Sequence, residues 1–291
     1  MPRTAAGLRT DPTTRLAELQ RRHPEWHAWL QLVGEAERTV SDAAWSTPAG
    51  MSHFEASPGT PLLHGAILRI DAVTVQELLR RLALIASDFE GAASLRRYLP
   101  SAEDAARLLA AAVRQDADEI EQVARARELD VGALTSVAHL ATLPWLRSAG
   151  QLLQDRIPEH WPHGYCPVCA AWPIFAERRG LDRSRRLRCG RCAAQWEVQW
   201  LYCIYCNERN HEQLATLEPE DQAETLKVET CASCNGYLKS IATLQGFPDF
   251  ELLLQDLETV ELDLVAMERS YHRPPGGGFT LDIDIASDAS R

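Results

Sequence analysis

The chain has 291 residues, 45% of them hydrophobic and 24% charged, and a net charge of −11. This composition is that of an ordinary globular protein, which excludes disordered and collagen-like classes. The negative balance argues against a protein whose main task is to bind phosphate backbones. Residues 1–11 have no apolar run behind Arg3 and Arg9, and no stretch reaches the roughly 18 apolar residues of a membrane span. We therefore expect no signal peptide and a cytoplasmic location.

Residues 1–162 are predicted to form a mainly helical N-terminal domain, because apolar residues recur there at helical intervals. Residues 51–68 are rich in Pro, Gly, Ser and His and indicate a loop. Ser101, followed three residues later by Asp104, is typical of a capping box. The expected helices cover residues 15–30 with a break at Pro24, 74–98, a segment from Ser101, 116–128, 131–144 and 145–157.

The sequence pattern changes after residue 162. Short segments there carry β-branched or aromatic residues next to cysteines. We predict a first four-cysteine metal module at 163–200 and a second at 201–245, both small β modules of the rubredoxin-like or zinc-ribbon kind, with a strand at 196–202. Residues 246–273 are predicted to form one amphipathic helix. Residues 274–291 are predicted to be a disordered acidic tail, with an edge strand at 279–285 as the alternative.

The eight cysteines form four Cys-x-x-Cys pairs with none left over. A two-residue spacer lets one tight turn direct two thiolates at a single tetrahedral ion, and a reducing compartment favours metal over disulfides. The first and second pairs are separated by 19 residues, and the third and fourth pairs by 24. These spacings favour two consecutive sites, although an interleaved pairing remains open. The consecutive sites are Cys166, Cys169, Cys189 and Cys192, followed by Cys203, Cys206, Cys231 and Cys234.

Four thiolates occupy every tetrahedral position, and both zinc and iron accept this ligand set. Such a closed site is structural or transfers electrons, and it cannot activate water. The sequence contains no Gly-x-Ser-x-Gly, His-Glu-x-x-His or Gly-rich phosphate loop, so we predict that the protein is not an enzyme. The residue after the second cysteine of a metal knuckle often has positive φ, which Asn207 and Asn235 suit better than Ala170 and Ala193.

An arginine-rich segment lies between the first two cysteine pairs and contains a single acidic residue. One interpretation is a solvated loop, and the other is a surface that binds an acidic segment or nucleic acid. The aromatic residues Trp196, Trp200, Tyr202 and Tyr205 lie close by and keep a nucleic-acid ribbon open, but the zero net charge of residues 163–240 counts against it. The candidate partner-binding residues are Arg178, Arg179, Arg183, Arg185, Arg186, Arg188 and Arg191.

The cysteine motifs and their neighbours carry a resemblance to a known family. In order, the chain contains Cys166-Pro-Val-Cys169, Arg185-Arg-Leu-Arg-Cys189-Gly-Arg-Cys192-Ala-Ala-Gln-Trp196, Cys203-Ile-Tyr-Cys206 and Glu229-Thr-Cys231-Ala-Ser-Cys234-Asn-Gly-Tyr237-Leu-Lys239. This series resembles the FdhE family of formate dehydrogenase accessory proteins. The chain departs from that family at Ala170 and Ala193, where Gly is usual, and at Arg186 and Trp200.

The resemblance implies a cytoplasmic assembly chaperone with a helical N-terminal domain and two rubredoxin-like modules. It implies that the protein binds the catalytic subunit of a formate dehydrogenase before twin-arginine export and is needed for active enzyme. The cysteine spacing and the arginine-rich segment leave two other hypotheses about the function open. They are a rubredoxin-like electron-transfer or redox protein, which would need iron, and a nucleic-acid-binding zinc ribbon.

Overall fold

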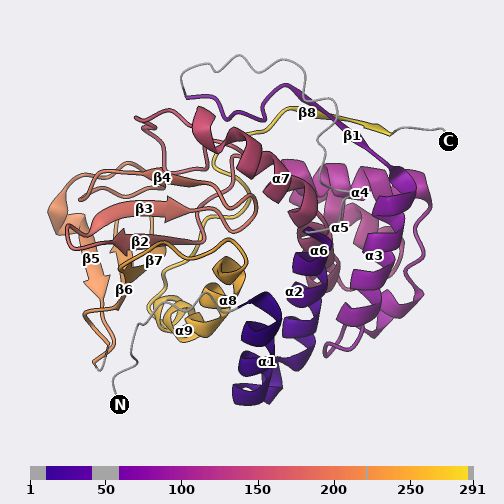
Figure 1. Ribbon diagram of the computed structural model, residues 1–291, viewed down its shortest axis with the longest axis horizontal. Coiled ribbons are helices and arrows are strands. Elements are labelled where there is room, and N and C mark those ends of the chain that lie inside the picture. Colours follow the sequence, from indigo (N-terminus) through magenta and orange to yellow (C-terminus); the bar gives the residue numbers. More distant parts are fainter. Residues whose placement is uncertain (1–10, 41–58, 221, 288–291) are drawn as a thin grey trace.

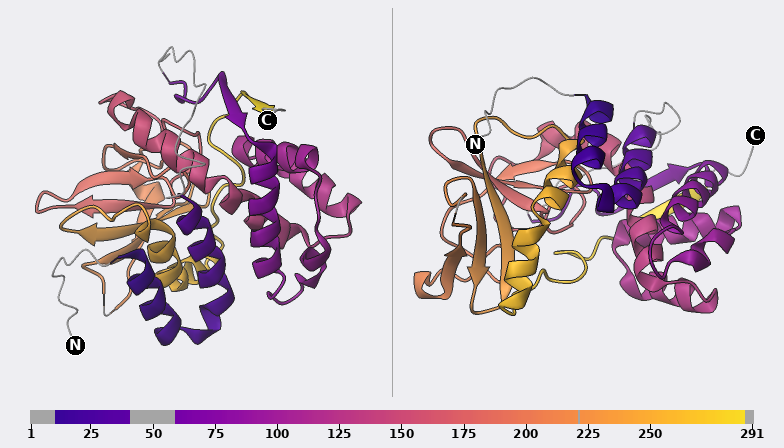
Figure 2. Two further views of the ribbon diagram at one scale, coloured as in Figure 1. Left: turned by 45° about the vertical axis from the view of Figure 1, so that its right-hand side comes forward. Right: turned by 90° about the horizontal axis from the view of Figure 1, so that it is seen from below.

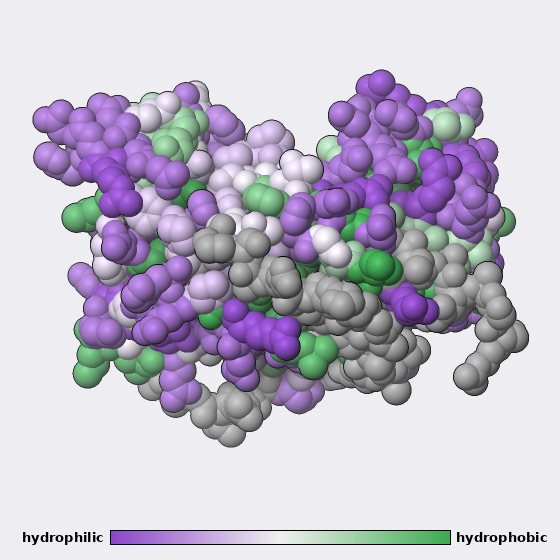
Figure 3. Space-filling view, turned by 90° about the horizontal axis from the view of Figure 1, so that it is seen from above, coloured by the Kyte–Doolittle hydropathy of each residue, from purple (hydrophilic) through white to green (hydrophobic). Residues whose placement is uncertain are grey.

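The computed structural model describes residues 11–40, 59–220 and 222–287. Helices of the first half lie on one side of the molecule and a β-sheet on the other (Figure 1). The face drawn in Figure 3 is hollowed between two lobes, one on the side of the sheet and one on the side of the helices. The helices of the first half are α1 (Pro12–Arg22), α2 (His27–Val40), α3 (Ala72–Ala86), α4 (Ala102–Arg114), α5 (Ala117–Ala126), α6 (Val131–Ala141) and α7 (Leu143–Leu153).

Side-chain caps fix the starts of several of these helices. The Ser101 hydroxyl accepts a hydrogen bond from the Asp104 amide at 3.0 Å, which confirms the predicted cap of α4. Pro24 opens a short 3-10 turn between α1 and α2, as expected of a break. Pro144 was predicted to end a helix, but it lies in the first turn of α7, where its missing N–H costs nothing.

Two antiparallel units form one six-stranded sheet of order β4-β3-β2-β7-β6-β5. The parallel pairing of β2 with β7, from Ala176 opposite Ser240 to Arg179 opposite Thr243, joins the two units. The strand predicted at 196–202 is shorter, because β4 ends at Glu197. The strands are β2 (Phe175–Arg179), β3 (Ser184–Arg188), β4 (Gln195–Glu197), β5 (Leu214–Leu217), β6 (Leu226–Cys231) and β7 (Gly236–Thr243).

Two short helices, α8 (Glu251–Glu258) and α9 (Val260–Glu268), cover one face of the sheet (Figures 1 and 2). The prediction of one helix over 246–273 is wrong, because Thr259 has φ −109° and ψ 19° and interrupts it. Leu252 of α8 packs near Phe175, and Leu262 of α9 packs near Val228. This face also holds the fully buried Lys239, whose ammonium pairs with Asp256 and Asp263 at 2.6 and 2.7 Å.

The prediction of a disordered tail at 274–291 is wrong for the residues that the structure describes. The segment 283–287 forms β8 (Ile283–Ser287), which pairs in parallel with β1 (Ala66–Ile70) next to the helices. The alternative edge strand is therefore the better prediction, displaced towards the C-terminus. Strand β1 also begins inside the loop predicted at 51–68. Residues 51–58 of that loop, residues 1–10 and residues 288–291 lie outside the described residues.

One hydrophobic core runs from the helices into the first cysteine module. It includes Leu32 of α2, Leu78 of α3 and Leu146 of α7 together with Cys166 and Trp196. The helical region is therefore followed by a sheet-containing part with two four-cysteine clusters, which confirms the predicted fold class. Among the described residues, none of the helices has the length and apolar character needed to cross a bilayer.

Candidate metal centres

The first cluster consists of the sulfurs of Cys166, Cys169, Cys189 and Cys192, which all lie within 4.8 Å of one another. The Sγ atoms of Cys166 and Cys192 are 3.4 Å apart, and those of Cys169 and Cys189 are 3.5 Å apart. A tetrahedron with metal–sulfur bonds of about 2.3 Å has edges of about 3.8 Å, so these separations suit one ion with only small adjustment. All four cysteines are buried.

The second cluster has the same arrangement but a different environment. The Sγ atoms of Cys203 and Cys234 lie 3.6 Å apart, and those of Cys206 and Cys231 lie 3.7 Å apart. Cys206 is exposed and Cys234 is half-buried. The grouping of sulfurs confirms consecutive pairing and shows that the interleaved alternative is wrong. Each cluster could hold one zinc or iron ion.

Tight turns direct each pair of sulfurs inward. In the first turn the amide of Ala170 donates to the Cys166 carbonyl at 3.0 Å, while the amide of Val168 donates to the Cys166 sulfur at 3.4 Å. The Ala193 amide donates to the Cys189 carbonyl at 3.1 Å in the second turn. Such N–H···S bonds favour thiolate over thiol. The tight turns agree with the prediction that a two-residue spacer directs two sulfurs at one ion.

All four residues that follow a second cysteine adopt positive φ. The values are 64° at Ala170, 61° at Ala193, 61° at Asn207 and 53° at Asn235. The alanines therefore occupy a left-handed conformation that costs an L-residue about 1–2 kcal/mol. The knuckle geometry is therefore the same at all four turns, although alanine suits it less well than asparagine.

Burial raises the pKa of the Cys203 thiol and of the Cys166 thiol, whereas at Cys189 and Cys231 hydrogen bonds from neighbouring groups outweigh burial and lower the pKa. Four thiolates in such a place repel one another and lose hydration, which favours the protonated form. A divalent ion at the centre reverses this preference, because its charge stabilises the thiolates. The donor set therefore fits an ion better than it fits four free thiolates.

Helix α7 holds the first cluster against the helical core. A Cβ atom at Gly150 would lie 1.9 Å from the main-chain oxygen of Cys192, so only glycine fits there. The buried Arg147 of the same helix donates to the Gly190 carbonyl at 3.2 Å and pairs with Glu37 at 3.3 Å. Leu62 and Leu63 donate main-chain hydrogen bonds to Pro167 and Val168, at 2.7 and 3.0 Å respectively. The first cluster is thus enclosed by the helical core, whereas the second reaches the surface.

The arginine-rich segment is not the solvated loop of the first interpretation. Its residues 178–179 belong to β2 and 184–188 to β3, which pair with each other. Arg188 pairs with the fully buried Glu177, and Arg179 pairs with the same carboxylate. Arg191 instead donates to the main-chain oxygens of Ala112 and Val113, at 2.6 and 3.3 Å.

The seven arginines also do not form one exposed docking surface. Arg178, Arg185 and Arg188 are only 5%, 3% and 3% exposed. Arg186 pairs with Glu197 at 2.9 Å at the edge of the sheet. The arginines therefore divide between the two faces of the sheet, and those of one face, Arg178 and Arg185 with the rim residue Arg183, line a pocket.

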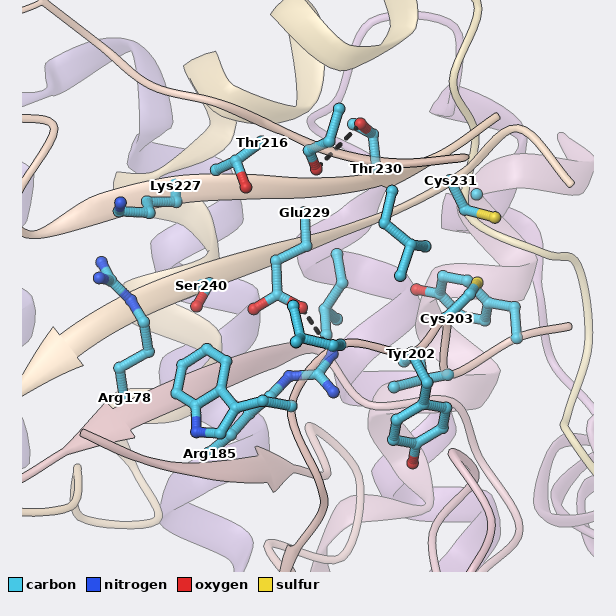
Figure 4. Close-up of a pocket in the computed structure, with 18 of the residues that line it drawn as sticks. Arg178, Arg185, Tyr202, Cys203, Thr216, Lys227, Glu229, Thr230, Cys231 and Ser240 are labelled. Atoms are coloured by element: carbon cyan, nitrogen blue, oxygen red, sulfur yellow. Dashed lines mark hydrogen bonds and ion pairs between the residues drawn. The ribbon is translucent and has the colours of Figure 1, made fainter. Parts of the chain in front are cut away.

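This pocket has a volume of about 350 Å³ and lies beside the second cluster (Figure 4). Cys203 and Cys231 form part of its wall, so the pocket and the second cluster share residues. Sequence reasoning missed its polar members Lys227, Glu229 and Ser240. The alternation of polar residues along β6 was the available signal, since it places Lys227 and Glu229 on the same face. The segment 200–205, with Trp200 and Tyr202, closes one side.

With these sites described, the chain can be compared with known proteins. Residues 201–277 match the family model described as FdhE, C-terminal domain. These residues are similar to the FdhE C-terminal domain. The matched region holds the whole second cluster, α8, α9 and the part of the pocket wall that follows Trp200. The resemblance to the FdhE family drawn from the cysteine motifs is confirmed.

Curated relatives show the same similarity. A Protein FdhE homolog of Stutzerimonas stutzeri (strain A1501) is 35% identical over 134 residues, which are 45% of this chain and 43% of the relative. A Protein FdhE homolog of Haemophilus influenzae (strain PittEE) is 28% identical over 135 residues, 45% of this chain and 44% of the relative. The chain thus spans less than half the length of these relatives.

A solved structure has the same overall fold. It is described as the crystal structure of the FdhE protein from Pseudomonas aeruginosa, and it aligns with a TM-score of 0.58 and 23% identity. The alignment covers 93% of this chain and 94% of that one. The fold similarity therefore extends through the helical region as well as the residues that match the FdhE C-terminal domain.

Proposed function

We propose that this chain is a cytoplasmic, non-enzymatic accessory factor that binds the catalytic subunit of a formate dehydrogenase before its export and is needed for active enzyme. The single observation that carries the proposal is the FdhE C-terminal domain with its complete second cluster. The arrangement of the clusters agrees with a binding role, because four sulfurs around one ion leave no position for water or substrate. The eight cysteines are proposed as the ligands of two ions.

The test combines loss of function with direct capture. In the host, deletion of the gene should abolish formate oxidation, and the wild-type chain should restore it. The tagged chain should capture the catalytic subunit from lysate of the same host, and metal analysis of the purified chain should find two ions per chain. Unchanged formate oxidation in the deletion strain, together with failure to capture the subunit, would refute the proposal.

A second candidate function is rubredoxin-like electron transfer, favoured by the exposure of Cys206 in the second cluster. Electron transfer needs an ion close to the surface and requires iron, because zinc is redox-inactive. A protein purified without oxygen should then be iron-loaded and red when oxidised. A colourless preparation that contains only zinc would exclude this function. The internal pairing of Arg179, Arg185 and Arg188 counts against the nucleic-acid ribbon.

A further inference from the structure

The pocket beside the second cluster lies on the sheet face that α8 and α9 leave open. Alternation along β7 sends Tyr237 and Lys239 towards α9 and sends Leu238 and Ser240 into the pocket. Figure 4 shows Arg185 of β3 meeting Glu229 of β6 in the pocket, with Arg178 of β2 to one side beyond Ser240. The floor of the pocket is thus a rigid sheet, which can hold a ligand in one orientation.

The charges in this pocket are unbalanced. Arg185 pairs with Glu229 at 2.5 Å, and Lys227 pairs with Glu218 at 2.5 Å. Arg178 has no carboxylate partner among the described residues, and its Nη2 reaches only the main-chain oxygen of Glu224 at 3.4 Å. Burial and then the neighbouring Arg183 lower the pKa of Arg178, and the more distant carboxylates of Glu229, Glu218 and Glu224 offset this only in part. An incoming carboxylate would supply the missing counter-charge at Arg178.

Unpartnered polar atoms point to a ligand that both accepts and donates hydrogen bonds. The Nε atoms of Arg178 and Arg185, the Oε1 atom of Glu229 and the Oγ atom of Ser240 are buried without a hydrogen-bond partner in the part of the chain that the structure describes. Arg178 is 5% exposed and Ser240 is fully buried. A lone anion would satisfy an arginine but would be repelled by Glu229, whereas a peptide brings amide donors as well as a carboxylate.

Apolar side chains at the rim of the pocket indicate that its ligand also has an apolar part. Trp200 and Leu201 border the pocket and are 45% and 74% exposed, and Leu238 contributes an apolar floor. Large apolar side chains left in water at the edge of a polar pocket are typical of protein-binding sites. The occupant should therefore carry a large apolar side chain next to its carboxylate.

We infer that this pocket binds an extended segment of a partner protein in which Asp or Glu is adjacent to a large apolar residue. The carboxylate of the bound segment forms an ion pair with Arg178, and a main-chain amide of the segment donates a hydrogen bond to Glu229. The apolar side chain of the segment packs against Trp200. The inference deepens the proposed function, because it assigns the surface on which the captured subunit docks.

The direct test titrates a defined peptide into the full chain loaded with both ions. N-acetyl-Phe-Asp-Leu-amide should bind, and its Asn counterpart should bind at least about tenfold more weakly, since it lacks the charge-assisted bond. Arg178→Met should also weaken binding of the Asp peptide at least about tenfold. The matched control is Arg186→Met, because Arg186 lies on β3, which pairs with β2, but does not line the pocket. The affinity of this variant for the Asp peptide should stay within about twofold of that of the wild type.

Metal content and circular dichroism establish whether each variant is folded. If Arg178→Met fails to fold, Trp200→Ala replaces it, because the half-exposed Trp200 contributes to the rim rather than to the core. That variant should likewise lose at least severalfold in affinity for the Asp peptide. Equal affinity for the Asp and Asn peptides, or wild-type affinity in a folded pocket variant, overturns the inference.

Capture of the formate dehydrogenase subunit separates this inference from the proposed function. Loss of capture with Arg178→Met and retention with Arg186→Met supports both. Equal capture by both variants and wild type supports the accessory role but overturns the pocket as its docking surface. A chain that binds the Asp peptide selectively but captures no subunit supports the pocket and overturns the proposed partner.

Discussion

The junction between α7 and the first cluster offers a sharp test of how the helical region and the metal module depend on each other. Gly150→Ala adds one methyl group, whose carbon would lie 1.9 Å from the main-chain oxygen of Cys192 and 2.9 Å from its carbonyl carbon. These neighbours are backbone atoms of a metal knuckle, so they cannot rotate away. The helix, the knuckle or both must move.

The size of the required movement determines how much stability the Gly150→Ala variant loses. Ordinary contact begins at 3.4 Å, so relief of the clash needs a displacement of about 1.5 Å, the difference between 3.4 and 1.9 Å. Overpacking of a tight site costs about 1–3 kcal/mol and more where backbone must shift, which places this site at the upper end of that range. Alanine recovers about 1 kcal/mol through its higher helix propensity. We expect a net loss of at least about 2 kcal/mol.

The assay is urea unfolding followed by far-UV circular dichroism, with metal content measured on the same samples. Gly132→Ala in α6 is the matched control, because the nearest atom to its added carbon is the Asp130 carboxylate oxygen at 3.5 Å. That variant should be as stable as wild type or more stable by up to about 1 kcal/mol. A Gly150→Ala protein as stable as Gly132→Ala, with two ions retained, would refute the reasoning.

Three further expectations concern the clusters and one buried histidine. Cys203→Ser should abolish binding of the second ion and leave the unfolding transition of the helices in place. Cys189→Ser should abolish binding of the first ion and also lower the midpoint of that transition, because the first cluster lies in the helical core. Equal effects of the two variants on the unfolding followed by circular dichroism would contradict this. A chelator should remove the second ion first, since only that cluster is exposed, and simultaneous loss of both ions in metal analysis would count against it. Burial lowers the pKa of His139 from 6.5 to about 4, so the unfolded state binds more protons and stability falls as the pH drops through that window. His139→Gln should reduce the loss of unfolding free energy between pH 7 and pH 5, and an unchanged loss would contradict this cause.

The ligand sets of both clusters could be predicted because a Cys-x-x-Cys turn is a local structure. Spacing favoured the grouping of Cys166 with Cys189 and of Cys203 with Cys231 but left an interleaved pairing open, which the structure excludes. The N-terminal cap at Ser101 was predictable for the same reason, since the hydroxyl and the amide that it accepts from lie three residues apart. Local geometry of this kind needs no knowledge of the rest of the fold.

The arginine-rich strands were not predictable, because their partners are distant in the sequence. Arginine is a poor indicator of a strand, and a run of arginines looks like a solvated segment. In the folded chain Arg185 pairs with Glu229, 44 residues away, and Arg188 reaches Phe247, 59 residues away. The same limitation applies to β8: the alternative edge strand at 279–285 gave no indication of its distant partner β1.

The two clusters have the same kind of ligands in different surroundings, and this difference leads to a last prediction. Cys203 and Cys231 belong both to the second cluster and to the pocket wall, so loss of the second ion should deform the pocket. Linkage is reciprocal, so a bound peptide must then increase the affinity of the second cluster for its ion by the same factor. Competition with a chromophoric chelator should show tighter zinc retention in the presence of the Asp peptide and no change with the Asn peptide. The first cluster, which shares no residue with the pocket, should retain its ion equally in both conditions. Equal retention at the second cluster with both peptides would mean that the pocket and the ion are uncoupled.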